Sequence, residues 1–287
     1  MFNLDEIKKQ LNPQQLTTVT TIDGPLLIIA GAGSGKTRTI TYRMAYMLSK
    51  GILQSSILAL TFTNKAAREM EERVKKITGK KLTNLTVSTF HAFGVKILRE
   101  DIERLGYRAN FSIYDQTDKI SLIKSTAREL KIDPNSLDLY SLSSIFSAIK
   151  TGLAKWTENT QEYKDIYEEY LDHLKVYNAV DFDDLITLPL KLFRENSDIL
   201  EKYREKYKYI MVDEFQDTSR IQYNLVQLLA EKSRNICAVG DDDQSIYSWR
   251  GADYANILQY EKDFPEVKEI KLEQNYRSSG NILKAAN

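Results

Sequence analysis

Residues 26–37 have the sequence Leu-Leu-Ile-Ile-Ala-Gly-Ala-Gly-Ser-Gly-Lys-Thr. The first five residues are apolar and predict a buried strand, and a helical pattern follows from about Lys36 to Leu48. A glycine-rich loop between a strand and a helix is the setting of a P-loop, in which backbone N–H groups surround phosphate oxygens. Three of the chain's 12 glycines lie within residues 31–35, so a glycine turn without a ligand explains the stretch poorly. The stretch predicts that Lys36 contacts the β- and γ-phosphates of a nucleotide and that Thr37 holds Mg²⁺.

A second stretch, Ile210-Met211-Val212-Asp213-Glu214, places two carboxylates directly after another apolar run. We expect Asp213 to hold Mg²⁺ and Glu214 to accept a proton from the attacking water. Alone, such a pair is typical of a cap or a turn, but a P-loop in the same chain favours the metal site. Gln244 follows the apolar run 236–239 and is suited to bind the γ-phosphate, although a polar turn explains that stretch equally well. The residues by themselves predict a Mg²⁺-dependent nucleoside triphosphatase.

Apolar runs alternate with helical patterns at both ends of the chain, which is typical of βαβ units and a parallel sheet. Strands are predicted at residues 26–30, 57–61, 86–88, 209–212, 236–239 and 267–272. From about Asp115 to Lys206 the strand signals disappear, and helices are predicted at 115–131, 136–150, 160–177 and 181–206. The predicted fold is therefore an α/β P-loop domain with a parallel sheet, interrupted by an all-helical insertion.

Composition and charge exclude several other classes. The 287 residues are 42% hydrophobic and 10% aromatic, as in an ordinary globular protein. The net charge is zero, but residues 1–110 carry 17 Lys and Arg against 9 Asp and Glu, so a polyanionic partner is not excluded. The longest apolar run, near residues 25–32, is far shorter than the ~20 residues that span a bilayer.

The N-terminal residues MFNLDEIKKQLN contain acidic side chains and no apolar core, unlike a signal peptide. We therefore expect a cytoplasmic protein with no membrane partner. Cys237 is the single cysteine, which excludes an internal disulfide. The two histidines, His91 and His173, together with this cysteine are too few to assemble a zinc site, and none is expected.

Six further sequence blocks make the prediction of a P-loop protein more specific. Besides AGAGSGKT at 30–37 and VDEFQDT at 212–218, the chain contains LNPQQLTTV at 11–19, TFTNKAAREM at 61–70, STFHAF at 88–93, DFDDL at 181–185, VGDDDQSIYSWRGAD at 239–253 and LEQNYRS at 272–278. In their order, spacing and residue identity, these eight blocks resemble those of the UvrD/PcrA/Rep family of superfamily 1 DNA helicases, and the resemblance covers essentially the whole chain. DEFQ differs from the DEAD-type box of superfamily 2, and the absence of LSGGQ argues against an ABC ATPase.

The resemblance implies a RecA-like motor domain with a helical insertion. Its expected parts are 1–110 and 183–271 for the motor domain, 111–182 for the helical insertion, and 272–287 for the start of a second RecA-like domain. The rest of that second domain, with its own insertion, is missing from the sequence. We therefore expect the chain to be the N-terminal piece of a longer helicase.

The resemblance also implies ATP and Mg²⁺ as cofactors and assigns roles around them. Gln15 would bind the adenine edge, Arg38 and Tyr276 would sandwich the base, and Arg277 would reach the γ-phosphate as an arginine finger, unless it is an exposed surface arginine. The implied nucleotide site consists of Gln15, Ala32, Gly33, Ser34, Gly35, Lys36, Thr37, Arg38, Tyr276 and Arg277. Its catalytic residues are Lys36, Glu214, Gln244 and Arg277, and its metal ligands are Thr37 and Asp213.

The implied partner is single-stranded DNA and its junctions with duplex DNA. The residues facing it would be Phe62, Asn64, His91, Tyr247, Trp249 and Arg250, because aromatic side chains stack on any base. The alternatives are core packing for the Phe, Tyr and Trp residues and a structural role for His91. A basic cluster lies nearby and is either part of this surface or a solvated helix face with acidic i,i+4 partners: Lys65, Arg68, Arg73, Lys75, Lys76, Lys80 and Lys81.

Two hypotheses of function follow. The parent protein would be an ATP-driven 3′→5′ translocase and helicase on single-stranded DNA. The 287-residue chain alone would be a monomeric nucleotide- and DNA-binding module without unwinding activity, since closure on ATP needs two domains. The alternative is a self-sufficient P-loop nucleoside triphosphatase that uses trans arginines in an oligomer. The pathway, whether repair, replication restart or plasmid replication, and the protein partners stay open.

Overall fold

The computed structural model of the chain describes residues 7, 9–241 and 255–276. By its internal contacts the chain forms two compact units, one made of residues 1–90 and 200–287 and the other of residues 91–199. The predicted edges of the insertion, at residues 111 and 182, fall inside the second unit. Five predicted site residues lie outside the described residues: Gln244, Tyr247, Trp249, Arg250 and Arg277.

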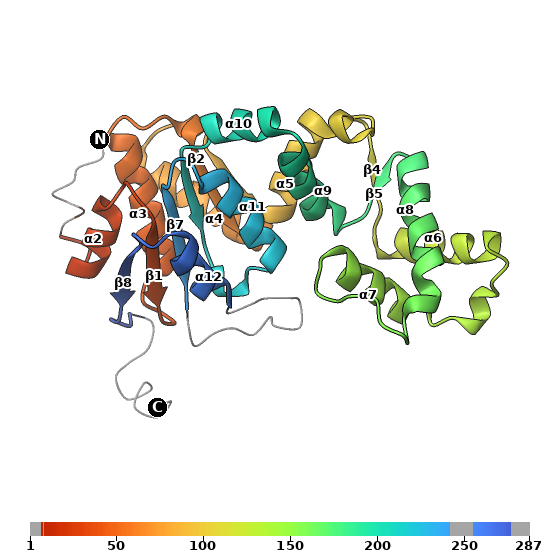
Figure 1. Cartoon of the computed structure of the whole chain (residues 1–287). Coiled ribbons are helices and arrows are strands. Elements are labelled where there is room, and N and C mark those ends of the chain that lie inside the picture. Colours follow the sequence, from red (N-terminus) through yellow and green to blue (C-terminus); the bar gives the residue numbers. More distant parts are fainter. Residues whose placement is uncertain (1–6, 8, 242–254, 277–287) are drawn as a thin grey trace, which may run out of the picture. The chain divides into compact units, whose positions relative to one another are not determined.

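The first unit contains a six-stranded sheet in which every strand is parallel to its neighbours (Figure 1). The strands, in their order across the sheet, are β3 (Thr86–Thr89), β2 (Ile57–Thr61), β6 (Tyr209–Val212), β7 (Ile236–Gly240), β1 (Leu26–Ala30) and β8 (Lys268–Leu272). All six predicted strands are present, with bounds within one residue of those expected. The prediction of an α/β fold with a parallel sheet is confirmed.

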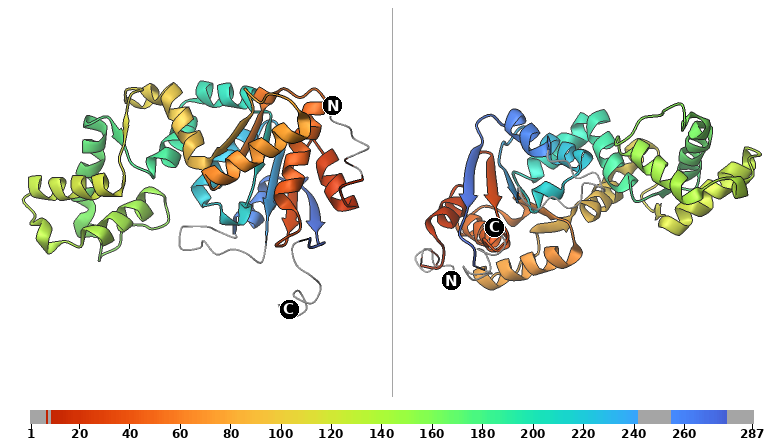
Figure 2. Two further views of the ribbon diagram at one scale, coloured as in Figure 1. Left: turned by 180° about the vertical axis from the view of Figure 1, so that it is seen from behind. Right: turned by 90° about the horizontal axis from the view of Figure 1, so that it is seen from below.

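The four inner strands are nearly continuous apolar runs because both faces of the sheet are covered there, whereas the edge strands β3 and β8 contain polar residues. Every residue of β2 and β7 is buried, as parallel strands with helices on both sides require. On one face the core is formed with helices α3 (Lys36–Ser49) and α4 (Asn64–Thr78). Helices α11 (Arg220–Ala230) and α12 (Ala255–Asp263) lie on the other face (Figures 1 and 2).

Helix α2 (Pro13–Thr20) was not predicted as an element and packs beside α3. It begins at a capping box, in which Asn12 accepts a hydrogen bond from the Gln15 N–H and the Gln15 side chain accepts one from the Asn12 N–H. Pro13 occupies the first turn, where its missing N–H costs no hydrogen bond. Helix α2 thus brings Gln15 to a defined place beside the P-loop.

The parallel arrangement gathers polar residues at one edge of the sheet. The segments that leave β1, β2, β6 and β7 begin at Gly31, Phe62, Asp213 and Asp241 respectively. Because parallel strands all end at the same edge, ligands of open α/β sheets bind there. The P-loop and the two carboxylates of the sequence analysis are therefore brought to one side of the domain by topology alone.

The second unit is mainly helical and has its own hydrophobic core. Its helices are α5 (Phe90–Asp101), α6 (Gln116–Glu129), α7 (Leu139–Lys150), α8 (Lys164–Val176) and α9 (Asp184–Glu195), and α10 (Ser197–Lys206) leads back to the first unit. Single 3₁₀ turns lie at Ile102–Leu105, Pro134–Ser136 and Gln161–Tyr163, and the first unit has two more, at Gln54–Ser56 and Phe215–Asp217.

One feature of the second unit differs from the prediction of helices alone. Strand β4 (Ser112–Ile113) pairs in parallel with β5 (Ala179–Val180). Asn178, directly before β5, has a positive φ of 52°, which interrupts the helical backbone after α8. A two-residue strand is too short to produce an alternating sequence pattern, and for this reason the prediction missed it.

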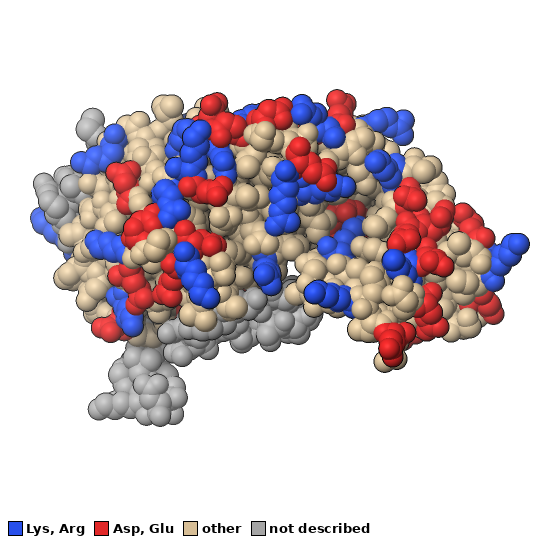
Figure 3. Space-filling view, viewed as in Figure 1, with Lys and Arg blue, Asp and Glu red and all other residues tan. Residues whose placement is uncertain are grey.

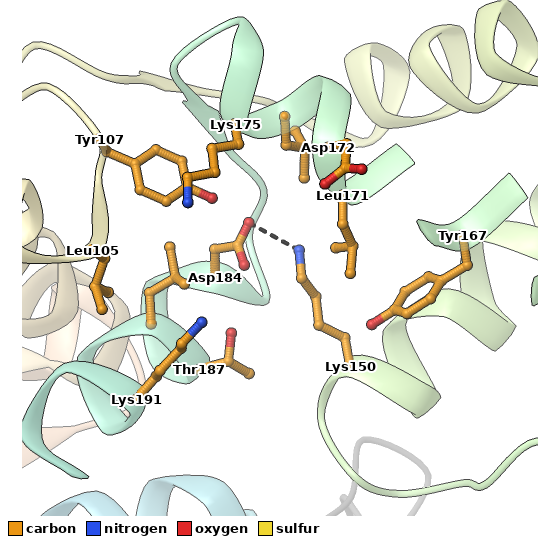
Figure 4. Close-up of a pocket in the computed structure, with 12 residues that line it drawn as sticks. Leu105, Tyr107, Lys150, Tyr167, Leu171, Asp172, Lys175, Asp184, Thr187 and Lys191 are labelled. Carbon is orange, nitrogen blue, oxygen red and sulfur yellow. Dashed lines mark ion pairs between the residues drawn. The ribbon is translucent and has the colours of Figure 1, made fainter. Parts of the chain in front are cut away.

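Buried ion pairs connect the helices of this unit. The Lys150 Nζ at the end of α7 lies 2.8 Å from a carboxylate oxygen of Asp184 (Figure 4) and 2.8 Å from one of Asp181. Tyr170 of α8 donates a hydrogen bond of 2.7 Å to Asp181, and Lys119 of α6 lies 3.0 Å from Asp183. Burial alone would raise the pKa of Asp181, but Lys150 and Lys119 lower it below the value of a free Asp side chain. The three Asp residues of DFDDL therefore hold α6, α7 and α8 to the start of α9.

Replacing Lys150 with Met tests this network. We expect Lys150→Met to lower the free energy of unfolding of the second unit by about 3–5 kcal/mol, because two buried carboxylates lose their cation. Trp156 packs against the core of this unit, so its fluorescence in a Trp249→Phe background reports the urea transition. The control is Lys164→Met, which removes an exposed pair with Glu168 at 3.6 Å and should cost about 1 kcal/mol or less. Equal losses in the two variants would contradict a structural role for the network.

Candidate functional site

The loop between β1 and α3 has the backbone geometry of a phosphate cradle. Gly33 and Gly35 have φ values of 76° and 87°, in the left-handed region that glycine adopts without steric cost. Gly35 is the N-cap of α3 and caps it with no side chain, so the first N–H groups of the helix lack a side-chain acceptor. Those N–H groups and the positive end of the helix dipole provide the kind of environment that binds anions.

Lys36, the first residue of α3, lies next to two carboxylates. Its Nζ is 3.3 Å from Oδ2 of Asp241 and 3.6 Å from Oε2 of Glu214. The Lys36 side chain is only 11% exposed and that of Asp241 is completely buried. The ammonium group is therefore held at the carboxyl edge of the sheet, beside the open helix N-terminus.

The two carboxylates after β6 reach the same edge through an unusual backbone conformation. Glu214 has φ 51° and ψ 46°, a left-handed conformation that is uncommon for a residue with a side chain. Adjacent residues of an extended strand point to opposite faces, and this turn brings both side chains to the strand end. The Glu214 N–H donates a hydrogen bond of 3.0 Å to the Asp213 carboxylate.

Negative charge accumulates around this turn. Burial, followed by the charge of Glu214, raises the pKa of Asp213 to about 7. The same two causes raise the pKa of Asp217 to about 6. A bound divalent cation would favour the ionised form of both groups. With the hydroxyl of Thr37 in the first turn of α3, the oxygen ligands at this edge are of the type that Mg²⁺ prefers.

Two residues of this cluster were not assigned by the sequence analysis. Gln216 donates a hydrogen bond of 2.8 Å to Glu214 Oε2 and accepts one of 3.0 Å from the Asp241 N–H. It thereby connects the ends of β6 and β7. Asp241 directly follows a buried strand, and the same rule that identified Asp213 would have found it. Gln216 has no such signal beyond its place in the VDEFQDT block.

Gln15 lies against the P-loop, where its side-chain amide already has two partners. Its Nε2 donates to the Ser34 carbonyl at 3.0 Å, and its Oε1 accepts from the Asn12 N–H at 3.1 Å. One N–H and one lone pair of the amide remain for a ligand. Ser34 itself is buried, and its hydroxyl has no hydrogen-bond partner among the described residues.

Arg38 and Tyr276, the residues predicted to sandwich a base, both lie close to the P-loop. The Arg38 guanidinium is exposed, 5.5 Å from the centre of the Tyr42 ring, and donates to the Gln10 carbonyl. The Tyr276 N–H donates to the Gly33 carbonyl at 2.8 Å, and the Tyr276 ring is 53% exposed. Asn275 donates to the carbonyl of Ala32 at 2.6 Å, so the segment after β8 is attached to the P-loop.

The described residues of the predicted DNA surface divide between the two units. In the first unit, Phe62 is half-buried with its ring centre 6.0 Å from that of Phe90, and Asn64 is exposed in the first turn of α4. In the second unit, the His91 ring contacts the Phe182 ring in a tilted arrangement, with ring centres 4.4 Å apart and 33° between the planes, and Phe182 is 59% exposed. Burial lowers the pKa of His91 although Asp183 opposes the shift. Phe182 belongs to the DFDDL block, but the sequence predicted no role for it, because its exposure is visible only in the structure.

The basic cluster on and after α4 is exposed, and among the described residues its one ion pair joins Arg73 to Glu69, 4.0 Å away and one turn earlier. Positive and negative side chains are interspersed over the face shown in Figure 3. The cluster therefore offers cations to a polyanion, while Arg73 also fits the alternative of a solvated helix face. No helix in the described part of the chain is both long and apolar enough to cross a membrane.

A parallel sheet with a P-loop after β1 and carboxylates after β7, its neighbour, and after β6, the next strand along, defines a P-loop domain of the RecA-like type. Residues 11–265 match the model of the UvrD/REP helicase N-terminal domain, and the chain belongs to this family.

Individual relatives agree with this assignment. The chain is 49% identical to the ATP-dependent DNA helicase PcrA of Bacillus subtilis, and the alignment covers 99% of the chain and 40% of that relative. It is 46% identical to the proteins of the same name from Staphylococcus aureus and Staphylococcus epidermidis, with the same coverage. The chain thus spans about two-fifths of the length of these relatives.

Two glycines of the P-loop provide a matched test of its geometry. A Cβ on Gly35 would lie 2.9 Å from Gln15 Nε2 and would occupy a left-handed backbone, whereas a Cβ on Gly31 meets no atom within 4 Å. We expect Gly35→Ala to lower the free energy of unfolding by about 1–2 kcal/mol and Gly31→Ala to change it by less than about 0.5 kcal/mol. Urea denaturation followed by far-UV circular dichroism measures both, and a larger loss in Gly31→Ala would contradict the described loop.

Proposed function

We propose that the carboxyl edge of the sheet binds Mg²⁺-ATP and that Lys36 is its central phosphate ligand. The observation that carries this proposal is the position of Lys36 at the open N-terminus of α3, 3.3 Å and 3.6 Å from two carboxylates. A γ-phosphate can replace the carboxylates as the partner of the ammonium group. The carboxylates then become available to a metal ion and to water.

The remaining residues of the loop fit the parts of a nucleotide. The N–H groups of Ala32, Gly33, Ser34 and Gly35 and the start of α3 would surround the phosphates. Gln15 would use its remaining N–H and lone pair on the adenine edge, and Arg38 and Tyr276 would enclose the ring. The Asn12–Tyr276 hydrogen bond of 2.8 Å supports this assignment because it links the helix of Gln15 to Tyr276.

Thr37 and Asp213 would hold Mg²⁺, which supplies positive charge to the β- and γ-phosphates when it is bound. Glu214 would orient the attacking water and accept its proton. Gln216 would keep Glu214 in place through the 2.8 Å hydrogen bond between their side chains. Gln244 and Arg277, outside the described residues, are proposed to contact the γ-phosphate.

For DNA, we propose a single strand that stacks its bases on exposed or half-exposed aromatic side chains. Four of these side chains come from the motif blocks: Phe62, His91, Tyr247 and Trp249. Phe182 is added because its ring contacts that of His91 and the residue is exposed. Asn64, Arg250 and the basic cluster after Phe62 would contact phosphates. Such a surface binds without sequence preference, since every base offers a face for stacking.

In the whole protein we propose a 3′→5′ helicase that couples ATP hydrolysis to unwinding at junctions of single- and double-stranded DNA. Support comes from family membership and from relatives named ATP-dependent DNA helicases. We propose that the 287-residue chain alone is a monomer that binds both ligands without unwinding. Family membership does not favour the alternative of a self-sufficient oligomer with trans arginines.

Single substitutions should separate the two ligands. Lys36→Ala is expected to weaken binding of a fluorescent ATP analogue at least about 100-fold, since a cation in direct contact with phosphate is lost (about 2.8 kcal/mol or more). Its affinity for a labelled oligo-dT should stay within about twofold. Trp249→Ala should do the reverse, because stacking contributes about 1–3 kcal/mol per base. If both substitutions reduce the same binding activity equally, the division of roles is wrong.

ATP turnover of the 287-residue chain, with and without oligo-dT, tests the proposal about the isolated chain. We expect slow hydrolysis that DNA stimulates little, because closure on ATP needs two motor domains and the 287-residue chain spans about two-fifths of the length of its relatives. A coupled assay for ADP release measures this directly. Strong stimulation by DNA would show that this part of the protein is a complete motor.

A further inference from the structure

A group of three side chains in the second unit, none of them part of the proposed nucleotide or DNA sites, points to a transition-metal site. Glu129, the last residue of α6, meets Glu169 and His173 of α8. Each offers one ligand atom, and the three atoms lie within 4.8 Å of one another. Glu169 and His173 are four residues apart on one helix, a spacing that puts both on the same face.

The distances between the ligand atoms fit a bound ion. His173 Nε2 lies 3.1 Å from Glu129 Oε2 and 3.4 Å from Glu169 Oε1. For metal–ligand bonds of about 2.0–2.2 Å, tetrahedral or octahedral angles separate neighbouring ligand atoms by about 3.0–3.5 Å. An ion could therefore contact all three groups after small movements of two partly exposed carboxylates.

The imidazole is already oriented for this role. Its Nδ1 is 3.1 Å from the hydroxyl of Thr126, which is fully buried, so Nε2 is the nitrogen that faces the carboxylates. The ring stacks on Tyr177 with centres 5.7 Å apart, and the His173 side chain is only 12% exposed. Metal-bound histidines are commonly fixed in this way, through a hydrogen bond of the other ring nitrogen.

A positive charge near Glu129 would also stabilise its carboxylate, because Glu129 is the last residue of α6. A carboxylate at the C-terminal end of a helix is disfavoured by the helix dipole. A second carboxylate nearby adds repulsion, and both are relieved by a divalent cation. Glu129 and Glu169 are 52% and 42% exposed, which leaves a path for the ion and room for water ligands.

We propose that Glu129, Glu169 and His173 bind one divalent transition-metal ion of the Zn²⁺ type, which connects the end of α6 to α8. One imidazole nitrogen and two carboxylate oxygens suit Zn²⁺, Co²⁺ and related ions, with water completing the coordination. Counting Cys and His in the sequence did not reveal this site, because carboxylates on two helices supply two of its three ligands. Binding stabilises the helical unit, since a ligand of the folded state shifts the unfolding equilibrium.

The test is titration of the nucleotide-free chain with Co²⁺, followed by its visible absorption, and with Zn²⁺, followed by calorimetry. We expect one equivalent to bind at this site in the wild type. His173→Gln and Glu129→Gln should abolish that equivalent, and Thr126→Val, which removes only the hydroxyl, should weaken it about 10- to 100-fold. Glu168→Gln is the matched control, since Glu168 lies on the same helix but pairs with Lys164, and it should bind as the wild type does.

A second measurement shows that the variants fold and that the ion acts in the second unit. Zn²⁺ should raise the urea midpoint reported by Trp156 in the wild type and in Glu168→Gln, but not in His173→Gln. Metal-free circular dichroism spectra of all variants should coincide. If the wild type binds no ion, or if His173→Gln retains the same equivalent, the three residues form only ion pairs and the proposal is wrong.

Discussion

The Lys36 ammonium group lies between Asp241 and Glu214, at the one edge where all six parallel strands end. The Asp241 carboxylate is completely buried and Lys36 is nearly so, and such a pair stabilises a fold only while both charges stay paired, because the loss of either leaves a charge without compensation. The P-loop, the left-handed turn at Glu214 and the Gln216 bridge all serve this arrangement. In the proposed function, a phosphate ligand replaces the carboxylates as the partner of Lys36.

Structure could be predicted from the sequence where a single physical rule decides the local conformation. Apolar runs of four or five residues predicted the four inner strands of the main sheet, since a parallel strand buried on both faces is apolar nearly throughout. The glycines before Lys36 predicted a phosphate-binding loop between a strand and a helix, and Gly33 and Gly35 have the positive φ values that glycine adopts without steric cost. The P-loop in the same chain favoured a metal site for Asp213 and Glu214, and the common edge at which parallel strands end explains why they lie near that loop.

Other features depended on contacts between distant parts of the chain and could not be predicted. Gln216 was missed because its role consists of hydrogen bonds to Glu214 and to the backbone of Asp241, 25 residues away. The β4–β5 pair was missed because two residues carry no periodic signal. Phe182 illustrates a third reason: its neighbours Asp181 and Asp184 are buried, and only the structure reveals that the ring between them is exposed. Family resemblance supplied roles for Gln15, Arg38 and Tyr276 that charge and periodicity did not indicate.

A crystal structure of the chain with Mg²⁺ and a non-hydrolysable ATP analogue is the most direct test of the proposal that Lys36 binds the phosphates. We expect Lys36 Nζ to leave Asp241 and to lie within hydrogen-bonding distance of the β- and γ-phosphates. Asp213 and Thr37 should then share one Mg²⁺ ion, with Glu214 facing a water near the γ-phosphate. A bound analogue elsewhere, with Lys36 still paired to Asp241 and Glu214, would contradict it.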